Sequence, residues 1–197
     1  QDQRAIPPLV AALEWRHPVM RAAAVRTLQA IGSRHAVDPL LERLRTGPPQ
    51  AQVAAARVLG TLDDERAVGP LVDALAARDR EVRQAVSSAL GSLGDARAVD
   101  PLVEALASPD PGVREAAAGA LGSLGDRRAI GALVGTLGDP DSIVRRQAAE
   151  ALDRLNEPIG RLIVETLEGS DRARQELVAT GDLRAIGPLI TAFESQD

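Results

Sequence analysis

Apolar and polar positions follow a pattern that repeats along the chain every 31 residues. In the stretch 95–125, apolar residues recur at spacings of three and four over 99–106 and again over 113–124, which predicts two amphipathic helices. The same pattern aligns without insertion at 2–32, 33–63, 64–94 and 126–156. A period of this length predicts stacked helix pairs rather than one globular core.

The residues that flank the expected helices indicate where each helix begins and ends. The position before the first helix always carries a side chain that can accept a hydrogen bond from a free N–H group. These residues are Asp2, Ser33, Asp64, Asp95 and Asp126. The position after the second helix always tolerates the left-handed conformation. These residues are Gly32, Asp63, Gly94, Gly125 and Asn156. In the central repeat, Asp110 and Pro111 are expected to begin the second helix as its cap and first residue.

Two further rows predict how the helices start and pack. A proline recurs early in the first helix (Pro8, Pro39, Pro70 and Pro101), so the regular first helix of the central repeat is expected near Ala98, after a tighter turn. Glycines recur inside the second helix (Gly60, Gly91 and Gly122), where each costs about 1 kcal/mol relative to alanine. Close approach between helices is the expected compensation. One repeat cannot bury its apolar faces alone, so the interfaces between repeats are expected to provide most of the stability.

The pattern weakens after Asn156. Residues 157–181 form a shorter, degenerate repeat, and 182–197 restart the pattern as a half repeat that places Phe193 in the row of Leu106. The sequence therefore predicts an all-α solenoid of about six helix pairs, wound as a right-handed superhelix, in a single domain over 1–197. A change of curvature is expected at the degenerate repeat.

Composition narrows the classes of function. The net charge of −5, with all 23 basic residues arginine, argues against general nucleic-acid binding. No apolar run reaches the roughly 18 residues of a membrane span, and no secretory leader opens the chain, so a soluble, cytoplasmic protein is expected. Both ends interrupt the repeat pattern. Two kinds of partner therefore stay possible for these ends: further parts of a longer chain, or a second copy of the chain that associates through the open end.

Candidate chemistry is sparse. Without cysteine there is no thiolate for catalysis or metal binding. His17 stands where other repeats carry aspartate, and His35 stands where they carry Arg66 and Arg97, so both are interpreted as surface substitutions. No glycine-rich phosphate loop follows an expected strand. The sequence predicts no catalytic residue, no metal site and no cofactor.

Several arginines have two interpretations. One row of arginines lies near the turn aspartates and consists of Arg21, Arg83, Arg114 and Arg145. This row is interpreted as an Asp–Arg ladder between repeats, with a basic groove as the alternative.

Arg26 and Arg57 occupy a row that is not fixed by packing, so they either bind a carboxylate or phosphate or belong to a solvated face. Arg146, Glu150 and Arg154 have the spacing of pairs that stabilise their own helix. Trp15 is either an interface anchor or a cover for the first repeat.

The phrase D-x-R-A-V-x-P-L-x-x-A-L, followed by a turn and V-R-x-x-A-A-x-A-L-G-x-L-G, resembles the HEAT-like repeat of the phycobilin-lyase type. The resemblance covers 2–156 well and 157–197 weakly. This repeat occurs in bilin lyase subunits, phycobilisome-degradation proteins, a di-iron deoxyhypusine hydroxylase and many bacterial scaffolds. The hydroxylase carries His-Glu pairs that bind iron. Here His17 precedes Pro18 and His35 precedes Ala36, so that activity is not expected.

The resemblance implies that the second helices line a concave binding face. The candidate partner-binding residues on or beside it are Trp15, Val19, Ala22, Arg26, Val53, Arg57, Gln84, Glu115, Arg146 and Glu150. The function expected is a non-enzymatic scaffold that binds a protein partner. The alternatives are a bilin lyase or chromophore chaperone that acts on a phycobiliprotein, and the interaction module of a larger signalling or membrane-associated protein.

Overall fold

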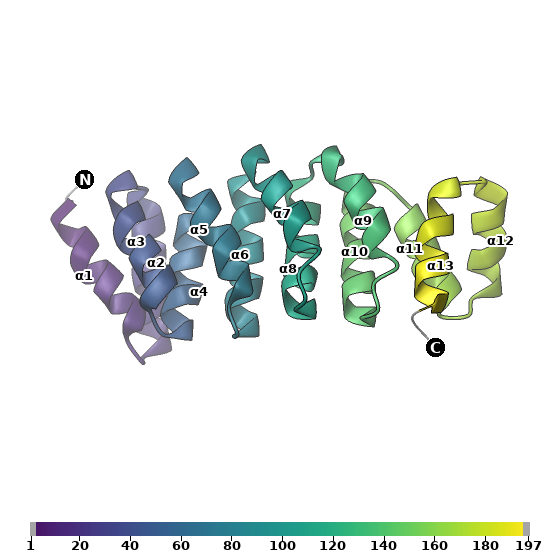
Figure 1. The fold of residues 1–197 in the computed structure, drawn as a ribbon. Coiled ribbons are helices and arrows are strands. Elements are labelled where there is room, and N and C mark those ends of the chain that lie inside the picture. The colour runs from purple at the N-terminus through teal and green to yellow at the C-terminus, as the bar shows by residue number, and fades with distance from the viewer. Residues whose placement is uncertain (1–2, 195–197) are drawn as a thin grey trace. The chain divides into compact units, whose positions relative to one another are not determined.

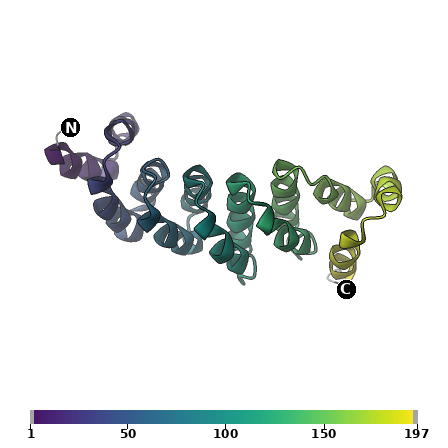
Figure 2. The ribbon, with the colours of Figure 1, turned by 90° about the horizontal axis from the view of Figure 1, so that it is seen from above.

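The computed structural model describes residues 3–194, which form helices and turns and no strand (Figure 1). The chain divides into two compact units, Gln1–Ala98 and Val99–Asp197. In the regular repeats of each unit, the first helices form one layer and the second helices form another (Figure 2). The all-α solenoid fold is thereby confirmed, and the single domain over 1–197 stays a prediction.

Unit 1 contains three helix pairs. The helices of the first layer are α1 (Ile6–Ala11), α3 (Val37–Thr46) and α5 (Val68–Asp73), and those of the second layer are α2 (Pro18–Ile31), α4 (Pro49–Leu59) and α6 (Arg80–Leu93). Short 3-10 turns extend α1 over Ala12–Glu14 and α5 over Ala74–Ala76. Helix α4 packs against both α2 and α6, so the second layer of unit 1 is continuous.

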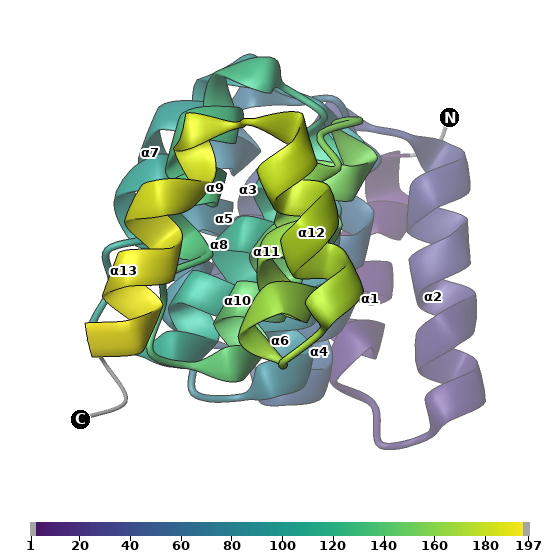
Figure 3. The ribbon, with the colours of Figure 1, turned by 90° about the vertical axis from the view of Figure 1, so that its right-hand side faces the viewer.

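Unit 2 contains α7 (Val99–Ala105), α8 (Pro111–Leu124), α9 (Ile130–Thr136), α10 (Ser142–Arg154), α11 (Ile159–Leu167), α12 (Asp171–Thr180) and α13 (Ile186–Glu194). Helix α10 packs against α8 and α11. The half repeat does not simply continue the stack: α13 contacts α9 as well as α11 (Figure 3). A Cβ atom added at Gly138, after α9, would lie 3.0 Å from the Cβ of Thr191 on α13. Phe193 lies in a part of α13 whose side chains are not described.

The predicted helix boundaries are largely confirmed. A 3-10 turn precedes most first helices, and α7 begins at Val99 after the turn Ala96–Ala98. Ser33, Asp64, Asp95 and Asp126 each accept a hydrogen bond from the N–H group two residues on. Asp2 lies outside the described residues. All five residues predicted to end the second helices have positive φ, including Asp63 (47°) and Asn156 (60°).

The glycine row shows the expected close packing, with one correction. A Cβ atom added at Gly60 would lie 2.8 Å from the Cα of Ala89, and one added at Gly122 would lie 2.6 Å from the Cα of Ala151. Gly122 is inside α8, but Gly60 is the residue that follows α4, because α4 ends at Leu59. The core around these contacts is aliphatic, and its second-helix leucines are fully buried. These leucines are Leu28, Leu59, Leu90, Leu121 and Leu152.

Candidate functional site

A groove of about 650 Å³ crosses the three second helices of unit 1. Four of the predicted partner-binding residues line it: Ala22 and Arg26 on α2, and Val53 and Arg57 on α4. Helix α6 contributes Glu81, Ala85, Ser88, Ala89 and Ser92. We call this feature the second-helix groove. It lies on the second helices, to which the resemblance assigns partner binding, and that assignment stays a prediction.

The groove has a small-residue floor and a polar rim. Ala54, Ala85 and Ala89 are buried at its base, where Gly60 allows α4 and α6 to approach closely. Arg57 and Ser88 are exposed at the rim. Because alanine and glycine project little beyond the helix backbone, a ligand can lie close to the helices between longer side chains.

The charges in the groove are unevenly distributed. Arg21, Arg26 and Arg57 come from α2 and α4, whereas Glu81 is the acidic residue of the lining and comes from α6. Arg21 donates a hydrogen bond from Nη1 to the carbonyl oxygen of Trp15 (2.9 Å). Within residues 3–194, the guanidinium groups of Arg26 and Arg57 have no hydrogen bond or ion pair. The α2–α4 half of the groove is therefore cationic.

Gln29 is a groove residue that the sequence reasoning missed. Its Nε2 donates to the carbonyl oxygen of Arg57 (3.2 Å) and so joins α2 to α4. A signal for it existed, because Gln29 interrupts the row occupied by Gly60, Gly91 and Gly122 in the next three repeats. A long polar side chain in a row of glycines marks a position where the interface is different.

Three candidates in unit 1 do not line the groove. Trp15 is 49% exposed in the turn before α2, and Val19 is 65% exposed near the start of that helix. Gln84 is exposed on α6. These three residues stay predicted contacts beside the groove.

The remaining candidates belong to unit 2. Glu115 is half-buried on α8, whereas Arg146 and Glu150 are exposed on α10. The predicted pairs within α10 are wrong: in the described part of the chain, neither Arg146 nor Arg154 forms an ion pair with Glu150. Nη1 of Arg154 instead lies 3.5 Å from Oγ of Ser123 on α8, across the helix interface.

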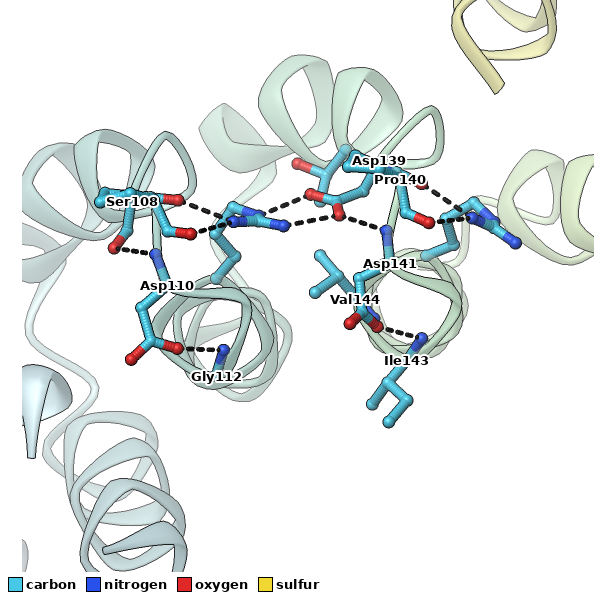
Figure 4. Close-up of polar contacts among 12 residues, drawn as sticks. Ser108, Asp110, Gly112, Asp139, Pro140, Asp141, Ile143 and Val144 are labelled. Carbon is cyan, nitrogen blue, oxygen red and sulfur yellow. Dashed lines mark hydrogen bonds and ion pairs between the residues drawn. The ribbon is translucent and has the colours of Figure 1, made fainter. Parts of the chain in front are cut away.

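The predicted Asp–Arg ladder is also corrected. Arg114 binds Asp139 with two hydrogen bonds, from Nε (2.7 Å) and Nη2 (2.9 Å), while Nη1 donates to the carbonyl oxygen of Ser108 (2.8 Å). Asp110 and Asp141 cap α8 and α10 through the N–H groups of Gly112 and Ile143 (Figure 4). Both members of the Arg114–Asp139 pair are largely buried, and the Asp139 hydrogen bonds raise the pKa of Arg114.

The other arginines of this row bind backbone instead of aspartate side chains. Nη1 of Arg83 donates to the carbonyl oxygen of Ala77 (2.8 Å), and Nη1 of Arg145 donates to that of Asp139 (2.8 Å). The row therefore fixes the turn between the two helices of a repeat, and in the described residues only Arg114 adds an ion pair to the next repeat.

A second charged row lies at the starts of the first helices. Each capping aspartate also pairs with the arginine two residues on, as Asp64 does with Arg66 (2.9 Å). Arg66 reaches back to Asp38 of the preceding repeat (2.8 Å), and Arg97 does the same with Glu65. The hydrogen bonds from the Arg66 side chain lower the pKa of Asp64 to about 2. The D-x-R part of the repeat is thus structural.

In the part of the chain that the structure describes, the two histidines form no site with acidic residues. His17 precedes α2 and makes no capping hydrogen bond through its side chain, and His35 lies beside Ser33 and Gln3. Among residues 3–194, no cluster of three or more His, Cys, Asp or Glu residues has an arrangement that could hold a metal ion. In the same range, no helix has the length and apolarity needed to cross a bilayer.

Residues 1–51, 37–122 and 99–181 match the family model for HEAT repeats, so the chain belongs to the HEAT-repeat family. No curated protein matches the sequence. A similar solved structure is the complex of CpcE and CpcF of phycocyanin lyase from Nostoc sp. PCC7120. It has 28% identity over 90% of this chain and 76% of that chain, with a TM-score of 0.55. The predicted resemblance to HEAT-like repeats of the phycobilin-lyase type is confirmed.

Two other similar structures are designed proteins. An engineered protein has 23% identity over 97% of this chain and 96% of that chain, with a TM-score of 0.45. A designed armadillo repeat protein in complex with the peptide (KR)4 has 20% identity over 95% of this chain and 99% of that chain, with a TM-score of 0.49.

Proposed function

We propose that this chain is a non-enzymatic scaffold that binds a protein partner in the second-helix groove of unit 1. The observation that carries the proposal is the groove itself, which is built from three consecutive second helices and has a small-residue floor below free arginines. Because the helices hold these residues before any partner arrives, little conformational entropy is lost on binding. The similar phycocyanin lyase structure is a complex of two proteins, which also favours a role in protein association.

The proposal is tested by blocking the groove without changing its charge. Ser88 is exposed and lines the groove, so Ser88→Trp places a large side chain in the path of a partner. The matched control is Ser142→Trp, at an exposed position at the start of α10 in unit 2. Each immobilised protein is incubated with a lysate of the organism that encodes it, and the retained proteins are quantified by mass spectrometry.

We expect a specific protein to be retained by the wild type and by Ser142→Trp and to be lost from Ser88→Trp. The retained protein is then purified, and its affinity for all three chains is measured by calorimetry. Equal affinity for the two variants would show that the partner does not use this groove. Circular dichroism of each variant checks that the helices are intact.

A second candidate function is a bilin lyase or chromophore chaperone subunit, and the similarity to the phycocyanin lyase complex favours it. No residue of the groove is assigned as an acid, base or nucleophile, so this candidate concerns binding of the chromophore. It is tested by mixing the chain with a free bilin and recording the visible absorbance after gel filtration. A bilin spectrum that co-elutes with the protein would support this candidate, and its absence would exclude it.

A further inference from the structure

Two arginines of the groove differ from most other arginines of unit 1 in their polar contacts. Arg66 and Arg97 are held in ion pairs at the turns, whereas the guanidinium groups of Arg26 and Arg57 contact no polar partner among the described residues. Both are exposed on the rim, and they occupy the same position in consecutive repeats. Their charge is available to an incoming anion.

We propose that the groove binds an extended, acidic segment of a partner polypeptide, and that Arg26 and Arg57 each bind one carboxylate of that segment. This inference rests on the proposed function, because it names the chemistry of the partner for the same groove. A guanidinium group suits this task, since it can donate two parallel hydrogen bonds to one carboxylate.

The position of the two arginines on neighbouring helices favours an extended ligand. Packed neighbouring helices generally lie about 8–10 Å apart. Helices α2 and α4 are neighbours, and Gln29 of α2 donates a hydrogen bond to the backbone carbonyl of Arg57 on α4. In a polyproline II segment, side chains three positions apart share a face and lie about 9 Å from each other. Two acidic residues separated by two others would therefore reach Arg26 and Arg57 together.

The floor of the groove fits the backbone of such a segment. Ala54, Ala85 and Ala89 present methyl groups and leave room for a main chain. Gln50, Ser88 and Ser92 at the rim offer hydrogen bonds to its carbonyl and N–H groups. A polyproline II segment makes no internal hydrogen bonds, so its peptide groups need partners of this kind.

The charges of the groove determine where the acidic residues of the ligand lie. The α2–α4 part of the groove carries the arginines, and Glu81 on α6 repels a carboxylate. The acidic residues of the segment therefore lie over α2 and α4, and its neutral part lies over α6. This local cationic surface contrasts with the net charge of −5 of the whole chain, which disfavours acidic partners elsewhere.

The probes are short fluorescein-labelled peptides with a serine and proline background and two glutamates separated by two residues. In the matched peptides, both glutamates are replaced by glutamine or by lysine. Binding is measured by fluorescence anisotropy at low salt. We expect the diglutamate peptide to bind about tenfold more tightly than the glutamine peptide, and Arg26→Gln and Arg57→Gln each to weaken it about fivefold.

The control variants separate this inference from the proposed function. Arg78→Gln removes an exposed arginine that does not line the groove and should leave the affinity unchanged. Equal binding of the glutamate and glutamine peptides, both abolished by Ser88→Trp, would overturn the acidic ligand and leave the groove as a binding site. Binding that survives Ser88→Trp would overturn the groove itself. Failure of every peptide to bind the wild type would overturn the acidic ligand, and the capture experiment then decides on the groove.

Discussion

At the scale of the residue, His17 precedes α2 without the side-chain hydrogen bond that the capping aspartates of the third, fourth and fifth repeats accept. Asp110 occupies the same position, also before a proline, and accepts a hydrogen bond from Gly112 N–H (2.7 Å). Asp79 and Asp141 cap their helices in the same way. The first repeat therefore has an unused capping site at the edge of unit 1.

We expect His17→Asp to raise the free energy of unfolding by about 1 kcal/mol, because the new carboxylate can accept a hydrogen bond from a free N–H group in the first turn of α2. The measurement is urea unfolding at neutral pH. The control is His17→Ala, which cannot accept a hydrogen bond. If the two variants were equally stable, capping at this position would be ruled out as the cause.

The residue scale also shows which contacts could be predicted from the sequence. The caps Asp64 and Asp110 could be predicted because a cap binds N–H groups two or three residues on, which sequence position alone determines. The partner of Arg114 could not be predicted from the sequence, since Asp139, Asp110 and Asp141 all lie near the same turns. The choice of Asp139 depends on side-chain geometry across two repeats.

At the scale of the element, the contact between α8 and α10 depends on the absence of a side chain at Gly122. A Cβ atom there would lie 2.7 Å from the Cβ of Ala151, well inside van der Waals contact. Both residues lie in the last turn of their helices, and Ala151 is fully buried, so an added side chain at Gly122 would push apart two helices that pack directly on each other. Glycine is retained at a helical position because the neighbouring helix fills the space.

We expect Gly122→Ala to lower the free energy of unfolding by about 1–3 kcal/mol, the usual cost of overpacking a core. Gly135→Ala is the matched control. Gly135 is also helical, in α9, and an added Cβ atom meets nothing within 4 Å. That exchange should stabilise the protein by up to about 1 kcal/mol through helix propensity. Thermal and urea unfolding of both variants test this difference, and a stabilised Gly122→Ala would contradict the packing explanation.

The groove was partly predictable at this scale. The repeat pattern assigns Arg26 and Arg57 to one row of the second helices, and both line the groove. Val19 and Gln84 were assigned to the same face but do not line the groove. Row membership fixes the angular position of a side chain around its helix. Where the groove ends along each helix depends on the packing of neighbouring repeats.

At the scale of the whole molecule, the repeat makes the fold of each unit predictable, because the interfaces between regular repeats within a unit are formed by the same rows of residues. The prediction weakens where the repeat does. The repeat pattern places 182–197 as a half repeat, and within its described residues α13 begins as expected after a capped turn. Its contact with α9 could not be predicted, because the shorter repeat before it changes which helix lies alongside.

The charged row at the starts of the first helices repeats through both units and should make the molecule sensitive to acid. Hydrogen bonds from the side chain of Arg66 lower the pKa of Asp64 from 3.8 to about 2. Arg97, Arg128 and Arg184 lower the pKa of Asp95, Asp126 and Asp182 in the same way. A depressed pKa in the folded state means that the unfolded chain binds protons first as the pH falls.

These aspartates therefore stabilise the fold fully above their unfolded pKa, and the contribution is lost as the pH falls through the folded value. For Asp64 the loss runs from about pH 4 down to about 2. We expect the melting temperature of the wild type to fall as the pH is lowered across this range. The melting temperature of Asp64→Asn should be lower than that of the wild type at neutral pH and should fall less across the same range. Arg66→Gln removes the cause of the shift and should flatten the pH dependence similarly. Circular dichroism melts at several pH values provide the measurement, and an unchanged slope in both variants would contradict the role of this pair.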